Sequence, residues 1–144
     1  MGKYISFSLG CLDFIDSFQF ISGPTQFHHM TEYFGTEKID LLLRKQIYPY
    51  EYLDSECKIT EEQLSPKEAF YSSLSGEDIS VEDYAHAQCV WKDFNIQSIG
   101  QYHDIYVLTD VLSLADEIEN FREICLNYYG LDAAHLYTSP GLAW

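Results

Sequence analysis

The sequence predicts a mixed α/β chain in which a β hairpin is followed by mostly α-helices, the last of them long. Apolar residues alternate with polar ones near the start of the chain, as they do in strands. Helix-start and helix-stop residues bracket later segments, and apolar residues recur every three or four positions over a final stretch. With 144 residues, 47% of them hydrophobic, the chain is long enough for one domain with its own core.

The hairpin is predicted within the segment KYISFSLGCLDFIDSFQF, residues 3–20. Ile5, Phe7 and Leu9 alternate with smaller or more polar residues, and the alternation resumes at Leu12. Gly10 stands between the two runs, where a tight turn is needed. We therefore expect two antiparallel strands that meet at Gly10.

A short helix is predicted over residues 24–34, because Pro24 is favoured at a first helical position and Gly35 at a helix end. The stretch from Thr36 to Gly76 is expected to be mixed and loop-rich. Within it, EKIDLLLRK has a helix-forming composition, and Pro49 in the next segment prevents that helix from continuing.

The next helix is predicted from Val81 to Phe94, because Ser80 and Asp83 have the spacing of a capping box. Spacings of three and four residues indicate which side chains of this helix are buried. They are Tyr84, Ala87, Trp91 and either Cys89 or Val90.

The last helix is the clearest element of the pattern. Ser98 and Gln101 form a capping box at its start, and Gly130 stands where a left-handed helix stop is expected. One apolar stripe is predicted to pack on the rest of the domain: Val111, Leu114, Ile118, Phe121, Cys125 and Tyr128. The neighbouring face holds Tyr106, Asp110, Ser113 and Glu117. A turn at Pro140 and Gly141 then leads to the end of the chain.

Composition excludes several classes of protein. Twenty-three acidic residues against eight basic ones give a net charge of −15, which repels a phosphate backbone. No apolar run approaches the length of a membrane span, and the first residues do not have the pattern of a signal peptide. The four cysteines are far apart and lack zinc-site spacing. We expect a soluble, intracellular protein with free thiols.

Tyr106 and Asp110 are the candidate functional residues. On a helix, residues at positions i and i+4 lie one above the other, so both side chains can reach one point. Two-metal nucleases use carboxylates to hold divalent cations, and a phenol can orient the attacking water. Asp110 would be the metal ligand and Tyr106 the group that positions the water. The alternative is that the two residues have this spacing by chance.

Five segments together resemble the type B DNA polymerases of the organellar and viral, protein-primed group, especially mobile-element polymerases of the Polinton or Maverick kind. The segments are FIDSFQF, LLLRKQIYPYEYLDS, PKEAFYSSLSGEDISVEDYAHAQCVWKDF, YHDIYVLTDVLSLADEIENFR and YTSPGLAW. In that family, Tyr-x-x-x-Asp is the third motif of the 3′–5′ exonuclease domain. The resemblance places it on Tyr106 and Asp110, and gives Asp16 and Ser17 a role in shaping the sheet and its turn.

The resemblance implies a partial ribonuclease-H-like α/β fold. Residues 1–137 would be the C-terminal part of the exonuclease domain, and residues 138–144 the start of the connection to the polymerase domain. The intact enzyme would use Mg²⁺ or Mn²⁺, DNA, deoxynucleotides and a terminal protein primer, without a membrane. It would be nuclear if it belongs to a eukaryotic mobile element.

The departures from the family pattern matter equally. The first exonuclease motif, Asp-x-Glu on an early strand, and the second, Asn-x-x-x-Phe/Tyr-Asp, are absent, as are the palm motifs. We therefore expect this segment to be inactive alone and to hold no metal tightly. Two alternatives remain open: a non-catalytic acidic interaction domain, and a stand-alone nuclease in which Asp13 and Asp16 supply the additional carboxylates.

Other residues favour packing over chemistry. His28 and His29 are neighbours that point in different directions on a helix, and we expect a solvated pair. His103, in the first turns of the long helix, is expected to pack against a neighbouring loop. Arg44 and Lys45 precede IYPYEY, a combination that can grip single strands, but we expect these tyrosines to cover the core. No nucleic-acid-binding residue is assigned.

Overall fold

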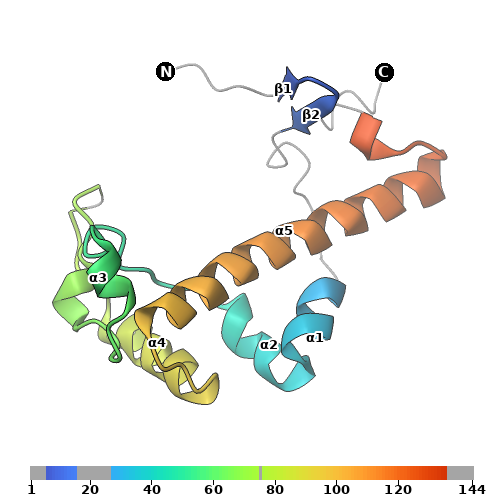
Figure 1. Cartoon of the computed structure of the whole chain (residues 1–144). Coiled ribbons are helices and arrows are strands. Elements are labelled where there is room, and N and C mark those ends of the chain that lie inside the picture. Colours follow the sequence, from blue (N-terminus) through green and yellow to red (C-terminus); the bar gives the residue numbers. More distant parts are fainter. Residues whose placement is uncertain (1–5, 16–26, 75, 136–144) are drawn as a thin grey trace. The chain divides into compact units, whose positions relative to one another are not determined.

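The computed structural model describes residues 6–15, 27–74 and 76–135 (Figure 1). The fold is mixed: a two-stranded antiparallel hairpin is followed by helices, one of them long. The chain divides into two compact units, residues 1–30 with 112–144 and residues 31–111, and the divisions fall within α1 and α5. The elements are β1 (Ser6–Leu9), β2 (Leu12–Ile15), α1 (His28–Phe34), α2 (Thr36–Leu43), α3 (Glu56–Ile59), η2 (Lys67–Phe70), α4 (Val81–Asp93), α5 (Ile99–Tyr129) and η3 (Ala133–His135).

The predicted hairpin is confirmed, with strands of four residues each. Gly10 has a positive φ of 64°, which glycine adopts without steric cost, and this allows the tight turn. Phe7 lies opposite Phe14, and Leu9 opposite Leu12, on one face of the hairpin. The two phenylalanine rings are stacked with centroids 4.6 Å apart. All four of these apolar side chains are exposed.

The predicted helix at residues 24–34 is observed over its second part as α1, His28–Phe34. Phe27 is not helical, and residues 24–26 lie outside the described ranges. Gly35 ends it with a φ of 81°, and its N–H donates to the Thr31 carbonyl at 2.9 Å. Helix α2 begins at the next residue, so most of EKIDLLLRK is helical, as its composition indicates. The remainder of residues 36–76 is mostly loop, as expected.

Helix α4 begins as the capping pattern predicts. Ser80 Oγ accepts a hydrogen bond from the Asp83 N–H at 2.9 Å. The open choice within its buried side is resolved, because Val90 is buried and Cys89 is exposed. Ala87 and Val90 form a core cluster with two residues beyond the helix, namely Ile96 and Tyr102.

Helix α5 is a single helix of 31 residues, as predicted. Ser98 Oγ accepts from the Gln101 N–H at 3.3 Å, and Gly130 comes directly after the helix with a φ of 68°. No helix in the described ranges is both long and apolar enough to cross a bilayer.

The predicted buried stripe of α5 is wrong for much of its length. Val111 is 56% exposed and Tyr128 80% exposed, whereas Cys125 is buried. Of the other three predicted positions, Leu114 is exposed, and Ile118 and Phe121 are only half-buried. The buried line through the first part of the helix runs instead through Tyr102, Thr109 and Asp116.

The reason for the difference lies at the start of α5. Tyr102 is fixed in the core cluster, and its hydroxyl donates to the Ile47 carbonyl at 2.7 Å. Residues seven apart lie on nearly the same side of a helix, so Thr109 and Asp116 follow Tyr102 inward. The contacts of Tyr102 therefore determine which side of α5 is buried more strongly than the spacing of its apolar residues does.

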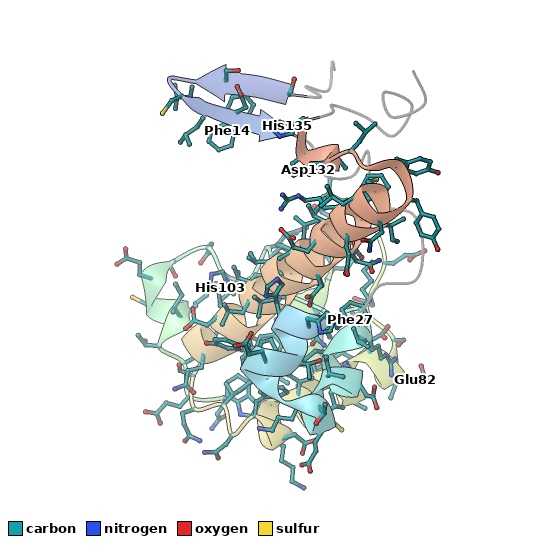
Figure 2. The ribbon with its side chains drawn as sticks, turned by 90° about the vertical axis from the view of Figure 1, so that its right-hand side faces the viewer. Phe14, Phe27, Glu82, His103, Asp132 and His135 are labelled. Carbon is teal, nitrogen blue, oxygen red and sulfur yellow. The ribbon has the colours of Figure 1, made fainter. Side chains whose placement is uncertain are left out.

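Beyond α5, a polar contact holds the chain as it turns back. The Arg122 guanidinium donates to both oxygens of Asp132, at 2.9 and 2.8 Å. Asp132 also accepts from the backbone N–H of Ala134 at 2.9 Å. Arg122 holds the pKa of the Asp132 carboxyl well below its usual range. Figure 2 labels Asp132 and His135 at this end of the chain.

Candidate tyrosine–aspartate site

Tyr106 and Asp110 lie one turn apart on α5, within the unit of residues 31–111. The Tyr106 side chain is half-buried and Asp110 is exposed. Burial raises the pKa of the Tyr106 phenol, and the Tyr50 hydroxyl and the Asp110 carboxylate raise it further. The pair therefore joins a neutral phenol to an exposed carboxylate that interacts with it.

Two tyrosines from the loop after α2 contact Tyr106. The Tyr50 hydroxyl is hydrogen-bonded to the Tyr106 hydroxyl. The Tyr48 ring is stacked on the Tyr106 ring, with centroids 4.7 Å apart and planes 29° from parallel. Tyr48 and Tyr50 also meet edge to face at 5.0 Å. The phenol of Tyr106 is thus held both through its ring and through its oxygen.

His103 completes this group, which we call the tyrosine cluster: Tyr48, Tyr50, His103 and Tyr106. Nδ1 of His103 and the hydroxyl of Tyr48 share a hydrogen bond of 2.7 Å. Figure 2 shows the His103 side chain on α5. The expectation that this part of the helix packs against a neighbouring loop is confirmed.

The loop that carries Tyr48 and Tyr50 is fixed by its backbone. The buried Tyr102 hydroxyl donates to the carbonyl of Ile47, and burial raises the pKa of this phenol. Pro49 is fully buried, and its carbonyl accepts from the Leu53 N–H at 3.2 Å. A tightly held loop can present its side chains to Tyr106 in one arrangement.

Arg44, the first of the two basic residues before this loop, forms an ion pair with helix α4. Arg44 donates to the Asp83 carboxylate at 2.8 Å, and this contact, after that with Ser80, lowers the pKa of Asp83. Tyr48 packs against the core cluster, as expected for a loop tyrosine that covers it. Tyr50 is 67% exposed, so the expectation that it covers the core is wrong for this tyrosine.

A further loop contact brings the segment after α3 against the start of α5. The Ile99 N–H donates to the Glu61 carbonyl at 2.9 Å, and the Glu61 carboxylate accepts from the Tyr52 hydroxyl at 2.9 and 3.0 Å. Next along the helix, Gly100 faces Ile59, and a Cβ there would stand 2.9 Å from an Ile59 methyl carbon. Only glycine fits this close approach without displacing its neighbour.

Metal ligands are not assembled at this place by the described residues. In residues 6–15, 27–74 and 76–135, no group of three or more His, Cys, Asp or Glu side chains could hold a metal ion. Asp110 is a single carboxylate, and Mg²⁺ in a two-cation centre needs several oxygen ligands. The described residues therefore do not by themselves fit such a centre.

Of the additional carboxylates proposed for a stand-alone nuclease, the structure describes only Asp13. Asp13 lies on β2, in the other compact unit, and accepts a hydrogen bond from Ser8 Oγ at 2.5 Å. Asp16 and Ser17 lie outside the described residues. His28 and His29 are exposed, and all four cysteines are free thiols, as expected.

The sequence singles out Tyr106 and Asp110 as candidates but does not reveal the partners of Tyr106. Tyr48 and Tyr50 precede it by more than fifty positions, and no periodic pattern links a loop to a helix over that distance. The one available signal was the grouping of tyrosines around a proline in IYPYEY, which indicates a rigid aromatic loop.

The chain matches no protein-family model, no curated protein and no solved structure in the three comparisons. The polymerase resemblance therefore depends on the five quoted segments.

Proposed function

We propose that this chain is part of a family B DNA polymerase of the protein-primed type and carries the third motif of its 3′–5′ exonuclease domain. One observation carries the proposal: the exposed carboxylate of Asp110 lies one turn from the immobilised, neutral phenol of Tyr106. A carboxylate that binds a cation must reach solvent, and a phenol that orients a reactant must be held still. Both requirements are met on one face of α5.

In this proposal residues 1–137 belong to a ribonuclease-H-like exonuclease domain and residues 138–144 begin the connection to the polymerase domain. Asp110 is one ligand for Mg²⁺ or Mn²⁺, and the other carboxylates come from elsewhere in the longer polypeptide. The 144-residue chain alone holds the cation weakly and does not cut DNA.

The substrates of the whole enzyme are DNA and deoxynucleotides, with a terminal protein as a candidate primer. A net charge of −15 keeps this segment from gripping DNA by charge. The basic surfaces that hold the template therefore belong to other parts of the polymerase. A eukaryotic mobile element would place the enzyme in the nucleus.

The test uses a polypeptide extended by the genomic sequence that flanks this segment on both sides. We expect it to shorten a single-stranded DNA from its 3′ end when Mg²⁺ is present. Asp110→Asn should lower the rate at least about 100-fold, because a cation ligand contributes several kcal/mol to the transition state. Asp104→Asn is the matched control, since Asp104 is an exposed carboxylate on the same helix. Equal trimming by both variants, or flanks without an Asp-x-Glu strand and a palm, would refute the proposal.

A non-catalytic acidic interaction domain is the second candidate. It is favoured by the exposed apolar face of the hairpin and by the lack of a cation-binding group within the described ranges. For the extended polypeptide, this candidate predicts a free energy of unfolding that does not change with Mg²⁺, whereas the polymerase proposal predicts an increase, since a ligand stabilises only the state that binds it.

A further inference from the structure

The Tyr106 ring also contacts Tyr48, whereas its hydroxyl is hydrogen-bonded to Tyr50. Tyr48 provides the flat surface on which the Tyr106 ring is stacked. The hydroxyl at the far end of Tyr48 is bonded to Nδ1 of His103 at 2.7 Å, and the two rings are 5.5 Å apart. His103 precedes Tyr106 by three positions on α5, so the helix supplies both ends of the arrangement.

Without His103, the Tyr48 side chain would keep its packing against the core cluster and the Tyr50 ring but would lose the hydrogen bond at its hydroxyl. The backbone on either side of Tyr48 is held, because the Ile47 carbonyl accepts from Tyr102 and Pro49 is buried. A tyrosine side chain still rotates about two bonds beyond a fixed backbone. The hydrogen bond to His103 restricts that rotation at the hydroxyl, the atom that such a rotation displaces most.

We propose that His103 is a positioning residue for Tyr106 and acts through Tyr48. The bond between His103 and Tyr48 selects the Tyr48 conformation that stacks on the Tyr106 ring. The stacked ring in turn keeps the Tyr106 phenol beside Asp110. The structural claim depends on the tyrosine cluster alone, whereas its effect on catalysis rests on the proposed exonuclease function.

The structural claim is tested by NMR of the 144-residue chain with labelled tyrosines. A ring stacked on Tyr48 has its proton signals displaced by the ring current of Tyr48. We expect His103→Leu to move the Tyr106 signals toward those of an unstructured tyrosine. His103→Asn should retain the wild-type signals, because its amide can donate or accept a hydrogen bond. Tyr48→Phe removes the hydroxyl and keeps the ring, so it should resemble His103→Leu, and the double variant should show no further change.

The control is His29→Leu, which replaces an exposed histidine on another helix and should leave the Tyr106 signals unchanged. Unaltered Tyr106 signals in a folded His103→Leu or Tyr48→Phe chain would overturn the proposal. Since either variant can give this result, misfolding of one does not prevent the test.

The catalytic consequence is measured in the extended polypeptide. His103→Leu should lower kcat for 3′-end trimming about fivefold, the worth of one hydrogen bond, and leave KM unchanged. His103→Asn should restore kcat. If the NMR signals respond as expected but the wild-type polypeptide trims no DNA, the positioning role stands and the exonuclease function fails. If trimming requires Asp110 but the NMR signals do not respond, the exonuclease function stands and the positioning role of His103 fails.

Discussion

The carboxylate of Asp116 on α5 accepts a hydrogen bond from the backbone N–H of His29, 87 positions earlier in the chain, at 2.7 Å. Its second oxygen accepts from the Met30 N–H at 3.1 Å. These donors belong to the first turn of α1, where backbone N–H groups have no partner within the helix. A buried carboxylate from a distant helix thus caps α1, whose own first turn contains no acidic residue.

Replacing this carboxylate should destabilise the fold. Asp116→Ala removes both acceptors, and we expect the free energy of unfolding to fall by about 2–3 kcal/mol. Urea denaturation followed by circular dichroism measures the change. Glu123→Ala, at an exposed carboxylate of the same helix, should change it by less than about 0.5 kcal/mol. Equal effects of the two substitutions would show that the Asp116 cap does not contribute.

The contact between Arg122 and Asp132 should resist acid. The pKa of Asp132 is lowered, first by Arg122 and then by the Ala134 N–H. A carboxyl with a lowered folded-state pKa contributes stability above its unfolded-state pKa and loses it as pH falls through the folded-state value. The Ala134 amide signal should therefore stay constant between about pH 7 and about pH 4 and move only in stronger acid. Asp132→Asn should give the moved signal at every pH, and a change centred near about pH 4 in the wild type would contradict the expectation.

Tyr106 should remain neutral beyond the usual range of tyrosine. Its pKa is raised by burial, then by Tyr50 and Asp110. A phenol with a raised folded-state pKa contributes stability below its unfolded-state pKa, about 10, and loses it as pH rises toward the folded-state value. Asp110→Asn removes a negative charge beside the phenol, so the Tyr106 pKa should fall. Titration of the Tyr106 ring carbons by NMR measures it, and an unchanged pKa in Asp110→Asn would mean that the two groups do not interact.

The junction between α1 and α2 should require glycine. Gly35 has φ 81° and ψ 152°, a backbone conformation in which other residues are strained. A Cβ at this position would meet no atom within 4 Å, so the cost of Gly35→Ala comes from the backbone alone. We expect a loss of about 1–3 kcal/mol in the free energy of unfolding. Glu37→Ala, on the exposed surface of α2, is the control, and an equal loss there would remove the special role of Gly35.

The parts of the fold that the sequence predicted correctly depend on local interactions. Ser80 and Ser98 cap their helices through N–H groups three residues away, and Gly130 ends α5 by its own backbone conformation. Such signals lie within a few residues of one another, so a single sequence contains them in readable form.

The features that the sequence did not predict depend on contacts between distant segments. Val111 has a suitable spacing for burial, yet it is exposed because Tyr102 sets the rotation of α5. The capping of α1 by Asp116 likewise joins residues that no local pattern connects. For the candidate site, the spacing of Tyr106 and Asp110 was visible, whereas the loop that immobilises the phenol was not.

A side chain at Gly100 would affect residues that Gly100 does not itself contact. Any larger residue there would push Ile59 away from α5, and the nearby Glu61 carbonyl would be drawn off the Ile99 N–H. Because Glu61 also holds the Tyr52 hydroxyl, the disturbance would pass into the chain segment that presents Tyr50 to Tyr106. A methyl group added at Gly100 would thus disturb the position of the Tyr106 phenol, almost two turns further along the same helix.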